Sequence, residues 1–155
     1  MKTLKIKDVM TNPAVCVNKN DTIINAAKIM QEHNIGAIPV VDDNNNLVGI
    51  VTDRDIIIRN IARELDPKDH KVSEIMTTNV KTVTPDTYVD EALEIMSEDQ
   101  VRRLPVVDES KNVIGMVSLG DVATTSDFYF ETGEALSEIS IPCHKKHPKN
   151  NEKSH

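Results

Sequence analysis

Apolar and polar residues follow two different periods in the first half of the chain. After Asn20 and Asp21, which can cap a helix, apolar residues recur three to four positions apart over 23–30, as on one face of an α-helix. The runs at 37–41 and 47–51 are short, apolar and rich in β-branched residues, with a polar segment between them. They predict two buried strands joined by a turn.

Two more elements complete this unit. A brief apolar strand is predicted at 14–17, before the first helix, and a second helix is predicted over 53–65. The residues expected along one side of that second helix are Ile56, Ile57, Ile61 and Leu65. The unit therefore has the order β-α-β-β-α, and the charged segment around Pro67 marks its end.

The same order of elements occurs again 66 residues later. Residues 5–57 align with 71–123 without a gap, and 16 of the 53 aligned positions are identical. The matching elements are a strand at 80–83, a helix capped by Asp86 and a pair of strands before a second helix. Chance explains such a match poorly, so the chain is predicted to be a duplication of one structural unit.

One such unit buries too little apolar surface to be securely stable alone. We therefore predict a mixed α/β (α+β) fold of two β-α-β-β-α repeats, packed sheet to sheet with pseudo-two-fold symmetry and helices outside. The predicted segments are repeat 1 at 5–66, repeat 2 at 71–126, a short C-terminal helix at 127–141 and a disordered tail at 142–155.

This duplicated pattern resembles the tandem cystathionine-β-synthase-type (CBS) domain pair, or Bateman module. The resemblance covers residues 5–123. It depends on Met-Thr near each start, Pro-Val-Val-Asp in the middle and Gly-x-Val-[Thr/Ser]-x-x-Asp before each second helix. It implies a regulatory module that binds an adenosyl ligand between the repeats: AMP, ADP, ATP, S-adenosylmethionine or an NAD-type dinucleotide. The family also includes modules that bind metal ions or no known ligand.

The third motif has a physical reason to hold such a ligand. Thr52 and Ser118 lie at predicted helix N-termini, where unpaired backbone N–H groups attract phosphate oxygen. Asp55 and Asp121 carry only acceptors, which suit the two donors of a ribose diol. The same spacing is also that of a capping box, in which both side chains satisfy the helix end without any ligand.

An adenosyl ligand also needs an apolar slot for adenine and, if phosphorylated, cations. The residues predicted to form the slot are Ala37, Ile38, Pro39, Leu104 and Pro105, with Val17 and Val83. The predicted phosphate ligands are Arg54, Arg102 and Arg103, because a guanidinium binds phosphate through parallel hydrogen bonds. Alternatively, these arginines pair with the many surface carboxylates.

Composition excludes several classes of function. The formal net charge is −7 with a pI near 5.2, which disfavours nonspecific binding to nucleic acid or anionic membranes. No apolar run is long enough for a membrane span, and two cysteines make no disulfide framework, so the cytoplasm is the expected compartment. Since no motif of paired catalytic groups is present, we expect no enzyme and no cofactor.

The predicted function is therefore that of a ligand sensor whose two repeats change their relative angle when the ligand binds, to be read by a regulated partner protein. One alternative is a ligand-free dimeric interaction scaffold. Another is a metal-responsive module that uses Cys143, His144 and His147, although a disordered terminus accounts better for that polar segment.

The segment after the second repeat contains Phe128, Tyr129 and Phe130, followed by apolar residues at helical spacing. It is predicted either to cover one edge of the module or to form a dimer contact, since aromatic residues favour buried interfaces. The family resemblance implies a homodimer. Cys16 is predicted to be a small buried residue in the first strand.

Overall fold

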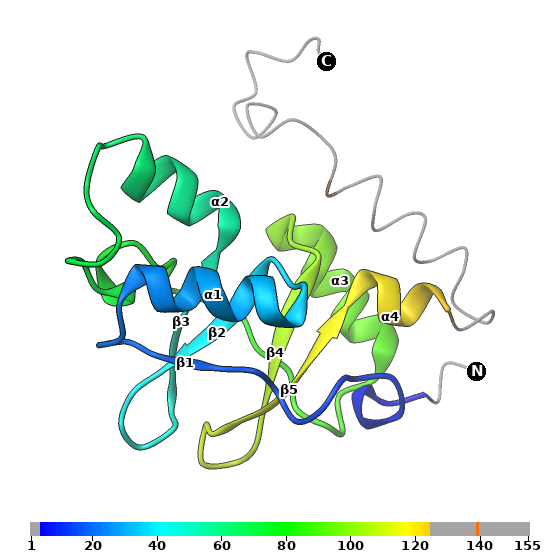
Figure 1. The fold of residues 1–155 in the computed structure, drawn as a ribbon. Helices are drawn as coiled ribbons and strands as arrows, with labels where there is room; N and C mark the ends of the chain where they lie inside the picture. Colours follow the sequence, from blue (N-terminus) through cyan, green and yellow to red (C-terminus); the bar gives the residue numbers. More distant parts are fainter. Residues whose placement is uncertain (1–3, 125–138, 140–155) are drawn as a thin grey trace, which may run out of the picture.

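The computed structural model describes residues 4–124 and residue 139, and it confirms the duplicated mixed α/β fold (Figure 1). Repeat 1 contains η1 (Ile6–Asp8), β1 (Val17–Asn18), α1 (Ile23–His33), β2 (Ala37–Val41), β3 (Leu47–Thr52), α2 (Asp53–Ile56) and the π-helical η2 (Ile57–Ile61). Repeat 2 contains η3 (Val72–Glu74), α3 (Val89–Asp99), β4 (Arg103–Val107), β5 (Val113–Ser118) and α4 (Leu119–Ala123).

Each repeat is built on an antiparallel strand pair, β2 with β3 and β4 with β5. β1 adds to β2 in parallel, but it begins only at Val17, so most of the strand predicted at 14–17 is wrong. The strand predicted at 80–83 is reduced to one parallel bridge between Val83 and Val106. Apolar character at these positions reflects burial rather than pairing, because Ala14 and Cys16 pack against a hydrophobic cluster.

The start of α1 lies one residue beyond the caps predicted for it. Thr22 is the N-cap, and its Oγ1 accepts a hydrogen bond from the Asn25 N–H at 3.2 Å. Asp21 instead accepts a hydrogen bond from the Thr22 N–H at 2.9 Å. The predicted residue type was correct, because a short polar side chain is what the orphan N–H groups of a helix start require.

The predicted cap of α3 is wrong. Tyr88 occupies the N-cap position, and Glu91 accepts a hydrogen bond from its N–H at 3.2 Å. Asp86 lies two residues earlier, where its carboxylate is 3.8 Å from Lys5 Nζ and 3.5 Å from Lys7 Nζ. These lysines come from the start of repeat 1, a proximity that the local pattern around Asp86 could not reveal.

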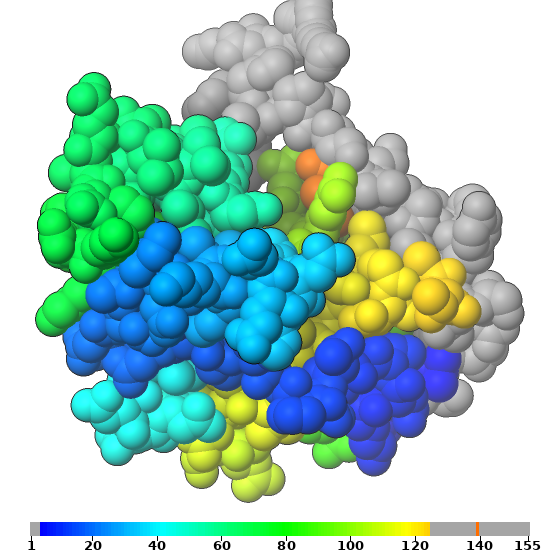
Figure 2. Space-filling model, viewed as in Figure 1, coloured from blue at the N-terminus to red at the C-terminus, as the bar shows by residue number. Residues whose placement is uncertain are grey.

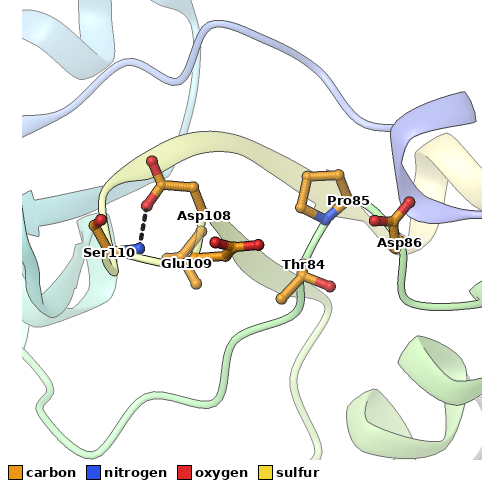
Figure 3. Close-up of a pocket in the computed structure, with 7 residues that line it drawn as sticks. Thr84, Pro85, Asp86, Asp108, Glu109 and Ser110 are labelled. Atoms are coloured by element: carbon orange, nitrogen blue, oxygen red, sulfur yellow. Dashed lines mark hydrogen bonds between the residues drawn. The ribbon is translucent and has the colours of Figure 1, made fainter.

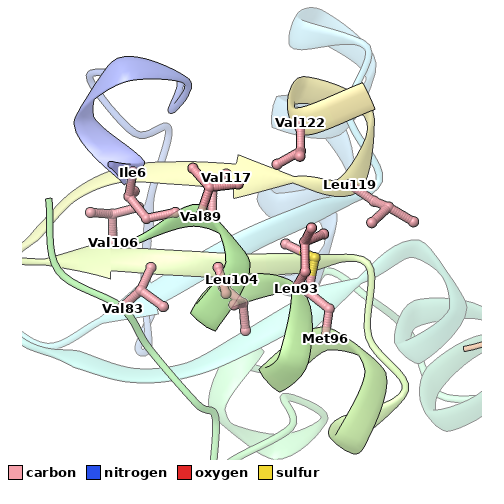
Figure 4. Close-up of a cluster of buried hydrophobic side chains, with 11 residues drawn as sticks. Ile6, Val83, Val89, Leu93, Met96, Leu104, Val106, Val117, Leu119 and Val122 are labelled. Atoms are coloured by element: carbon pink, nitrogen blue, oxygen red, sulfur yellow. The ribbon is translucent and has the colours of Figure 1, made fainter. Parts of the chain in front are cut away.

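The turn that begins each repeat, at η1 or η3, packs into the hydrophobic core of the other repeat. Ile6 is fully buried in the cluster of repeat 2, where Figure 4 shows it beside Val106 and Val117. Val72 and Ile75, from the start of repeat 2, are buried in the cluster of repeat 1. Each sequence repeat therefore completes its hydrophobic core with residues from the other.

Backbone hydrogen bonds fix both exchanged turns in the same way. The Ile6 N–H donates to the Thr87 carbonyl at 2.9 Å, and the Val72 N–H donates to the Asp21 carbonyl at 2.9 Å. The two donors, Ile6 and Val72, are related by the 66-residue shift, and so are the two acceptors, Asp21 and Thr87. The exchange is therefore a symmetric property of the duplication.

The two sheets meet along a seam of valines, which confirms packing sheet to sheet. Val41, Val107 and Val113 form a small buried cluster between them. An isolated bridge joins Asn46 to Asn112, two positions that are equivalent under the 66-residue shift. A residue that faces its own equivalent marks a pseudo-two-fold axis, so the predicted symmetry axis passes through this bridge.

The prediction for the second helix of repeat 1 is partly wrong. It becomes π-helical after Ile56, and of its apolar residues only Ile56 is buried. The exposed residues are Ile57 at 56%, Ile58 at 47%, Ile61 at 49% and Leu65 at 37%. Asn60, one helical turn after Ile56, occupies the inward position instead and is fully buried.

The predicted C-terminal helix, tail and aromatic segment lie outside the described residues except for Ile139, which packs against the repeat 2 cluster. Within the described part of the chain, no helix has the length and apolar character needed to cross a membrane.

Candidate functional site between the repeats

Thr52 lies where β3 ends and α2 begins, and it caps that helix. Its Oγ1 accepts a hydrogen bond from the Asp55 N–H at 3.0 Å, while Asp55 Oδ2 accepts one from the Thr52 N–H at 3.0 Å. The capping-box interpretation of this motif is therefore confirmed. The exchange still leaves the hydroxyl proton of Thr52 and the second carboxylate oxygen of Asp55 able to bind another group.

Repeat 2 uses the same geometry with a different electrostatic setting. Ser118 and Asp121 exchange the equivalent two hydrogen bonds, both at 3.0 Å. Asp55 is only 8% exposed, and its Oδ1 lies 3.8 Å from Arg59 Nε. Asp121 is half-buried and is in no ion pair with the residues that the structure describes. Its second oxygen is therefore the less compensated of the two.

Thr52 also lines a pocket of about 490 Å³ that both repeats build, which we call the inter-repeat pocket. Its lining comprises Ile50 and Thr52 from repeat 1, and Thr77–Lys81, Glu98, Asp99, Val101, Arg103 and Leu104 from repeat 2. A pocket of this size, with mixed apolar and polar walls, is typical of small-molecule sites.

Backbone pairing between the repeats holds this pocket together. Ile50 and Thr77 exchange two backbone hydrogen bonds, at 2.9 and 2.8 Å, so β3 is tied directly to the segment that enters repeat 2. Gly49 makes the approach possible, because a Cβ there would lie 2.7 Å from the Thr77 carbonyl oxygen. Because the walls of the pocket come from both repeats, a change in the angle between the repeats would move them relative to each other.

Cationic and hydroxyl groups converge on the repeat 2 wall of the pocket. Lys81 Nζ lies 3.8 Å from Asp99 Oδ2, which partly neutralises it. Arg103 is exposed and is in no ion pair with the described residues, as is also true of Arg54 and Arg102. The predicted alternative, pairing of these arginines with surface carboxylates, does not occur in this part of the chain. The guanidinium of Arg103 is therefore available to an anion.

The structure brings together only some of the residues predicted to bind a ligand. Thr52, Arg103 and Leu104 line the inter-repeat pocket, whereas Asp55 is only 8% exposed and is not among the lining residues. Those that are buried in or beside the strands instead are Val17, Ile38, Pro39, Val83 and Pro105. Ala37 is half-buried and paired in register with Thr52, while Arg54 and Arg102 are exposed outside the pocket lining. Ser118 and Asp121 lie at the equivalent helix start of repeat 2.

Sequence reasoning missed the segment from Thr77 to Lys81, which supplies much of the pocket wall. Its only signal was that Thr77 is part of the Met76-Thr77 landmark, which aligns with Met10 and Thr11. The chain between that landmark and the next helix has no regular element, so no local pattern placed it beside Thr52.

A second pocket, of about 550 Å³, is acidic. It is lined by Thr84, Pro85, Asp86, Val107, Asp108, Glu109 and Ser110 (Figure 3). Asp108 Oδ1 accepts a hydrogen bond from the Ser110 N–H at 2.9 Å, as a turn-forming aspartate does. Three carboxylates disfavour a phosphorylated ligand, and no group of metal-binding side chains is formed anywhere in the described residues.

Two titratable groups among the described residues have a shifted pKa. Burial raises the pKa of the Cys16 thiol, which is half-buried just before β1 rather than fully buried within it as predicted. The Lys71 N–H and the His70 side chain hold the pKa of Glu74 below its usual value. A thiol with a raised pKa is a weak nucleophile at neutral pH, in keeping with a structural role.

Comparison with known proteins bears directly on this site. The family model described as "CBS domain" matches residues 6–60 and 72–126. The chain is 42% identical over 135 residues to the "CBS domain-containing protein YhcV" of Bacillus subtilis, a match that covers 87% of this chain and 94% of that protein.

Two solved structures are similar over most of this chain. Hypoxic Response Protein I with two coordinated zinc ions is 36% identical, with a TM-score of 0.73, covering 79% of this chain and 98% of that one. The CBS domain pair of protein MJ0100, in complex with 5′-methylthioadenosine and S-adenosyl-L-methionine, is 34% identical, with a TM-score of 0.73, covering 82% and 98%.

Proposed function

The chain belongs to the CBS-domain family, and from that premise we propose that it is a regulatory module that binds an adenosyl ligand in the inter-repeat pocket. The observation that carries the proposal is the convergence of Thr52, at a helix start of repeat 1, with Arg103 and the Thr77–Lys81 segment of repeat 2. The similar domain pair of protein MJ0100 binds two adenosyl compounds, which supports this ligand class.

The pocket and the helix start beside it offer a counterpart for each part of the ligand. Ile50 and Val101 offer apolar surface for the adenine ring, whereas Leu104 is only 1% exposed. Thr52 and the second oxygen of Asp55 would bind the ribose hydroxyls at the helix start. Arg103 would bind a phosphate group, so AMP and more highly phosphorylated nucleotides suit this pocket better than an uncharged adenosyl thioether.

A ligand in this position touches both repeats at once. It would therefore favour whichever relative angle of the repeats improves its contacts, and only a difference in affinity between two arrangements can shift them. We propose that a regulated partner protein reads the resulting change of surface. The cytoplasm stays the predicted compartment.

Repeat 2 offers the equivalent half of a second site. Ser118 and Asp121 reproduce the geometry of Thr52 and Asp55, and Asp121 is the more accessible carboxylate. Ala37 aligns with Arg103, so the equivalent cation is missing there. We propose that a ligand held by Asp121 depends less on phosphate.

Calorimetry of the full chain with AMP and 5′-methylthioadenosine tests these assignments. Asp55→Ala and Asp121→Ala should each weaken binding at one site by about tenfold or more, because each removes an acceptor of a charged hydrogen bond. Arg103→Ala should weaken AMP binding and leave 5′-methylthioadenosine binding unchanged.

The matched control is Thr22→Ala, which removes a helix N-cap outside the pocket that contributes a similar amount to stability. Its affinities should equal those of the unmodified chain. If neither compound binds, or if both aspartate variants and their double mutant bind as the unmodified chain does, the adenosyl proposal fails.

A ligand-free homodimeric scaffold is the second candidate. The observation that favours it is that both capping boxes are satisfied without a ligand, while four apolar side chains after Ile56 are exposed. Thermal unfolding against a panel of adenosyl compounds separates the two candidates. A true ligand raises the midpoint by an amount that grows with the logarithm of its concentration relative to Kd, whereas a scaffold shows no shift.

A further inference from the structure

Arg59 contacts two groups that belong to different repeats. Its Nε lies 3.8 Å from Asp55 Oδ1, one helical turn earlier in the same segment. Its Nη1 donates a hydrogen bond to the Ile75 carbonyl oxygen at 3.3 Å, and Ile75 ends the turn that begins repeat 2. Figures 1 and 2 show the teal-green segment that carries Asp55 and Arg59 at a corner of the molecule, beside α1. One guanidinium therefore joins the proposed ribose carboxylate to the other repeat.

The carboxylate oxygen that faces Arg59 is the one that the capping box does not use. Asp55 Oδ2 accepts the hydrogen bond of the Thr52 N–H, so Oδ1 is the oxygen with which Asp55 would bind a ribose hydroxyl. Asp55 is buried, and a carboxylate withdrawn from water needs a nearby cation, which Arg59 provides. A separation of 3.8 Å is too long for a hydrogen bond, so the lone pairs of Oδ1 remain available to a ribose donor.

The capping box does not require this guanidinium. Ser118 and Asp121 form the same two hydrogen bonds in repeat 2, although Asp121 is in no ion pair with the described residues. Under the 66-residue shift, the position equivalent to Arg59 is a threonine, Thr125. The contacts of Arg59 are therefore a property of repeat 1 alone, beyond what the helix start needs in order to form.

The Ile75 carbonyl is a fixed point for the guanidinium. Ile75 is 3% exposed and packs in the hydrophobic cluster of repeat 1. Two residues later, the Thr77 N–H donates a hydrogen bond to the Ile50 carbonyl at 2.8 Å. The Arg59 contacts and this bridge therefore connect the same two stretches of chain, the end of β3 with its following helix and the segment that leads into the wall of the inter-repeat pocket.

We propose that Arg59 is a positioning residue for the ligand site, which keeps Asp55 Oδ1 in place for a ribose hydroxyl by anchoring on the Ile75 carbonyl. The proposal rests on the adenosyl site proposed above, because Arg59 acts through Asp55 and does not itself line the inter-repeat pocket. It concerns recognition of the ribose and not of the phosphate. Loss of Arg59 should therefore weaken AMP and 5′-methylthioadenosine by the same factor at this site, whereas loss of Arg103 should weaken AMP alone.

Calorimetry with AMP tests this role in the full chain carrying Asp121→Ala, so that only the Asp55 site is measured. Arg59→Met keeps a long alkyl side chain but removes the charge and the donors, and it should weaken binding by about tenfold or more. Arg59→Lys should restore part of the affinity, because it keeps a cation beside Asp55. The matched control is Arg63→Met, at an exposed arginine one turn later, which should leave the affinity unchanged. Circular dichroism checks that each variant is folded, and Arg59→Gln replaces Arg59→Met if the latter is not.

A ligand without ribose hydroxyls separates positioning from general support of the fold. The 2′,3′-dideoxy analogue of AMP cannot donate to Asp55, so Arg59→Met should leave its affinity unchanged while it weakens AMP. In a chain that also carries Asp55→Ala, Arg59→Met should cause no further loss of AMP affinity, since no carboxylate is left to position.

The possible failures are distinguishable. Equal AMP affinity with and without Arg59→Met refutes the positioning role and leaves the adenosyl site intact. Equal losses for AMP and its dideoxy analogue, or an equal loss in the Asp55→Ala chain, also refute it, because Arg59 then supports only the fold. If AMP binds the unmodified chain but not the Asp121→Ala chain, the Asp55 site and the role of Arg59 are both refuted. If the unmodified chain binds neither AMP nor 5′-methylthioadenosine, the adenosyl proposal itself fails, and the role of Arg59 fails with it.

Discussion

At the scale of one residue, Asn60 shows that a polar side chain can be buried without forming hydrogen bonds. Its side chain is fully buried, yet its amide has no hydrogen-bond partner in the described part of the chain. An unpaired buried polar group costs about 1–3 kcal/mol of folding free energy. The position is fixed by the helical geometry that follows Ile56, which faces inward one turn earlier.

Replacing this side chain should therefore cost unusually little. We expect Asn60→Ala to leave the free energy of unfolding unchanged or to raise it by about 1 kcal/mol, because the loss of packing is offset by removal of the unpaired amide. Met96→Ala, at an equally buried apolar position, should lower it by about 2–5 kcal/mol. Urea denaturation measures both. A comparable loss in the two variants would show that the Asn60 amide is well accommodated.

At the scale of elements, β3 and β5 each approach the entering segment of the other repeat through a glycine. A Cβ on Gly49 would lie 2.7 Å from the Thr77 carbonyl oxygen, and one on Gly115 would lie 2.7 Å from the Thr11 carbonyl oxygen. These are backbone atoms, which cannot turn aside as a flexible side chain can. The absence of a Cβ is therefore what lets the two strand-to-segment bridges form.

Two alanine substitutions in neighbouring elements should have opposite effects. Gly115→Ala should lower the free energy of unfolding by about 1–3 kcal/mol, because the strand must move away from Thr11. Gly120→Ala, in α4, should raise it by about 0.5–1 kcal/mol, since the nearest atom to its Cβ would be Ser118 Oγ at 3.6 Å. Chemical denaturation of both variants provides the comparison. Similar effects from the two would argue against the close approach at Gly115.

The elements also show how far the sequence predicts this molecule. The internal alignment and hydrophobic periods were sufficient for the helices α1 and α3 and the paired strands, since these depend on local pattern. They placed Thr52 and Arg103 as candidates without indicating that the two line one pocket, because that contact joins residues of different repeats. The inward side of the segment after Ile56 was predicted wrongly, since an apolar period does not reveal which side meets the core.

At the scale of the whole molecule, the exchanged turns make the two repeats one cooperative unit. Ile6 completes the core of repeat 2, and Ile75 completes the core of repeat 1. Neither core can be complete unless both repeats are folded and docked. The pairwise hydrogen bonds of the two turns to the segments before α3 and α1 add to this dependence.

Disruption of either turn should therefore destabilise the entire fold. Ile6→Ala and Ile75→Ala should each lower the free energy of unfolding by about 2–5 kcal/mol while a single transition is retained. Hydrogen exchange should report equal losses of protection for the slowest amides of α1 and α3 in each variant. If Ile6→Ala lowers protection in α3 alone, the repeats unfold independently.

The exchanged turns also determine what would happen if the chain were cut in the linker near Pro67. Each fragment would carry the leading turn that fills the hydrophobic core of the other fragment, so neither fragment could form a complete core alone. Mixed together, the two would recover the missing pieces only by reassociating. The intact chain thus resembles two complementing fragments of a split protein. The peptide linker keeps them at a high local concentration.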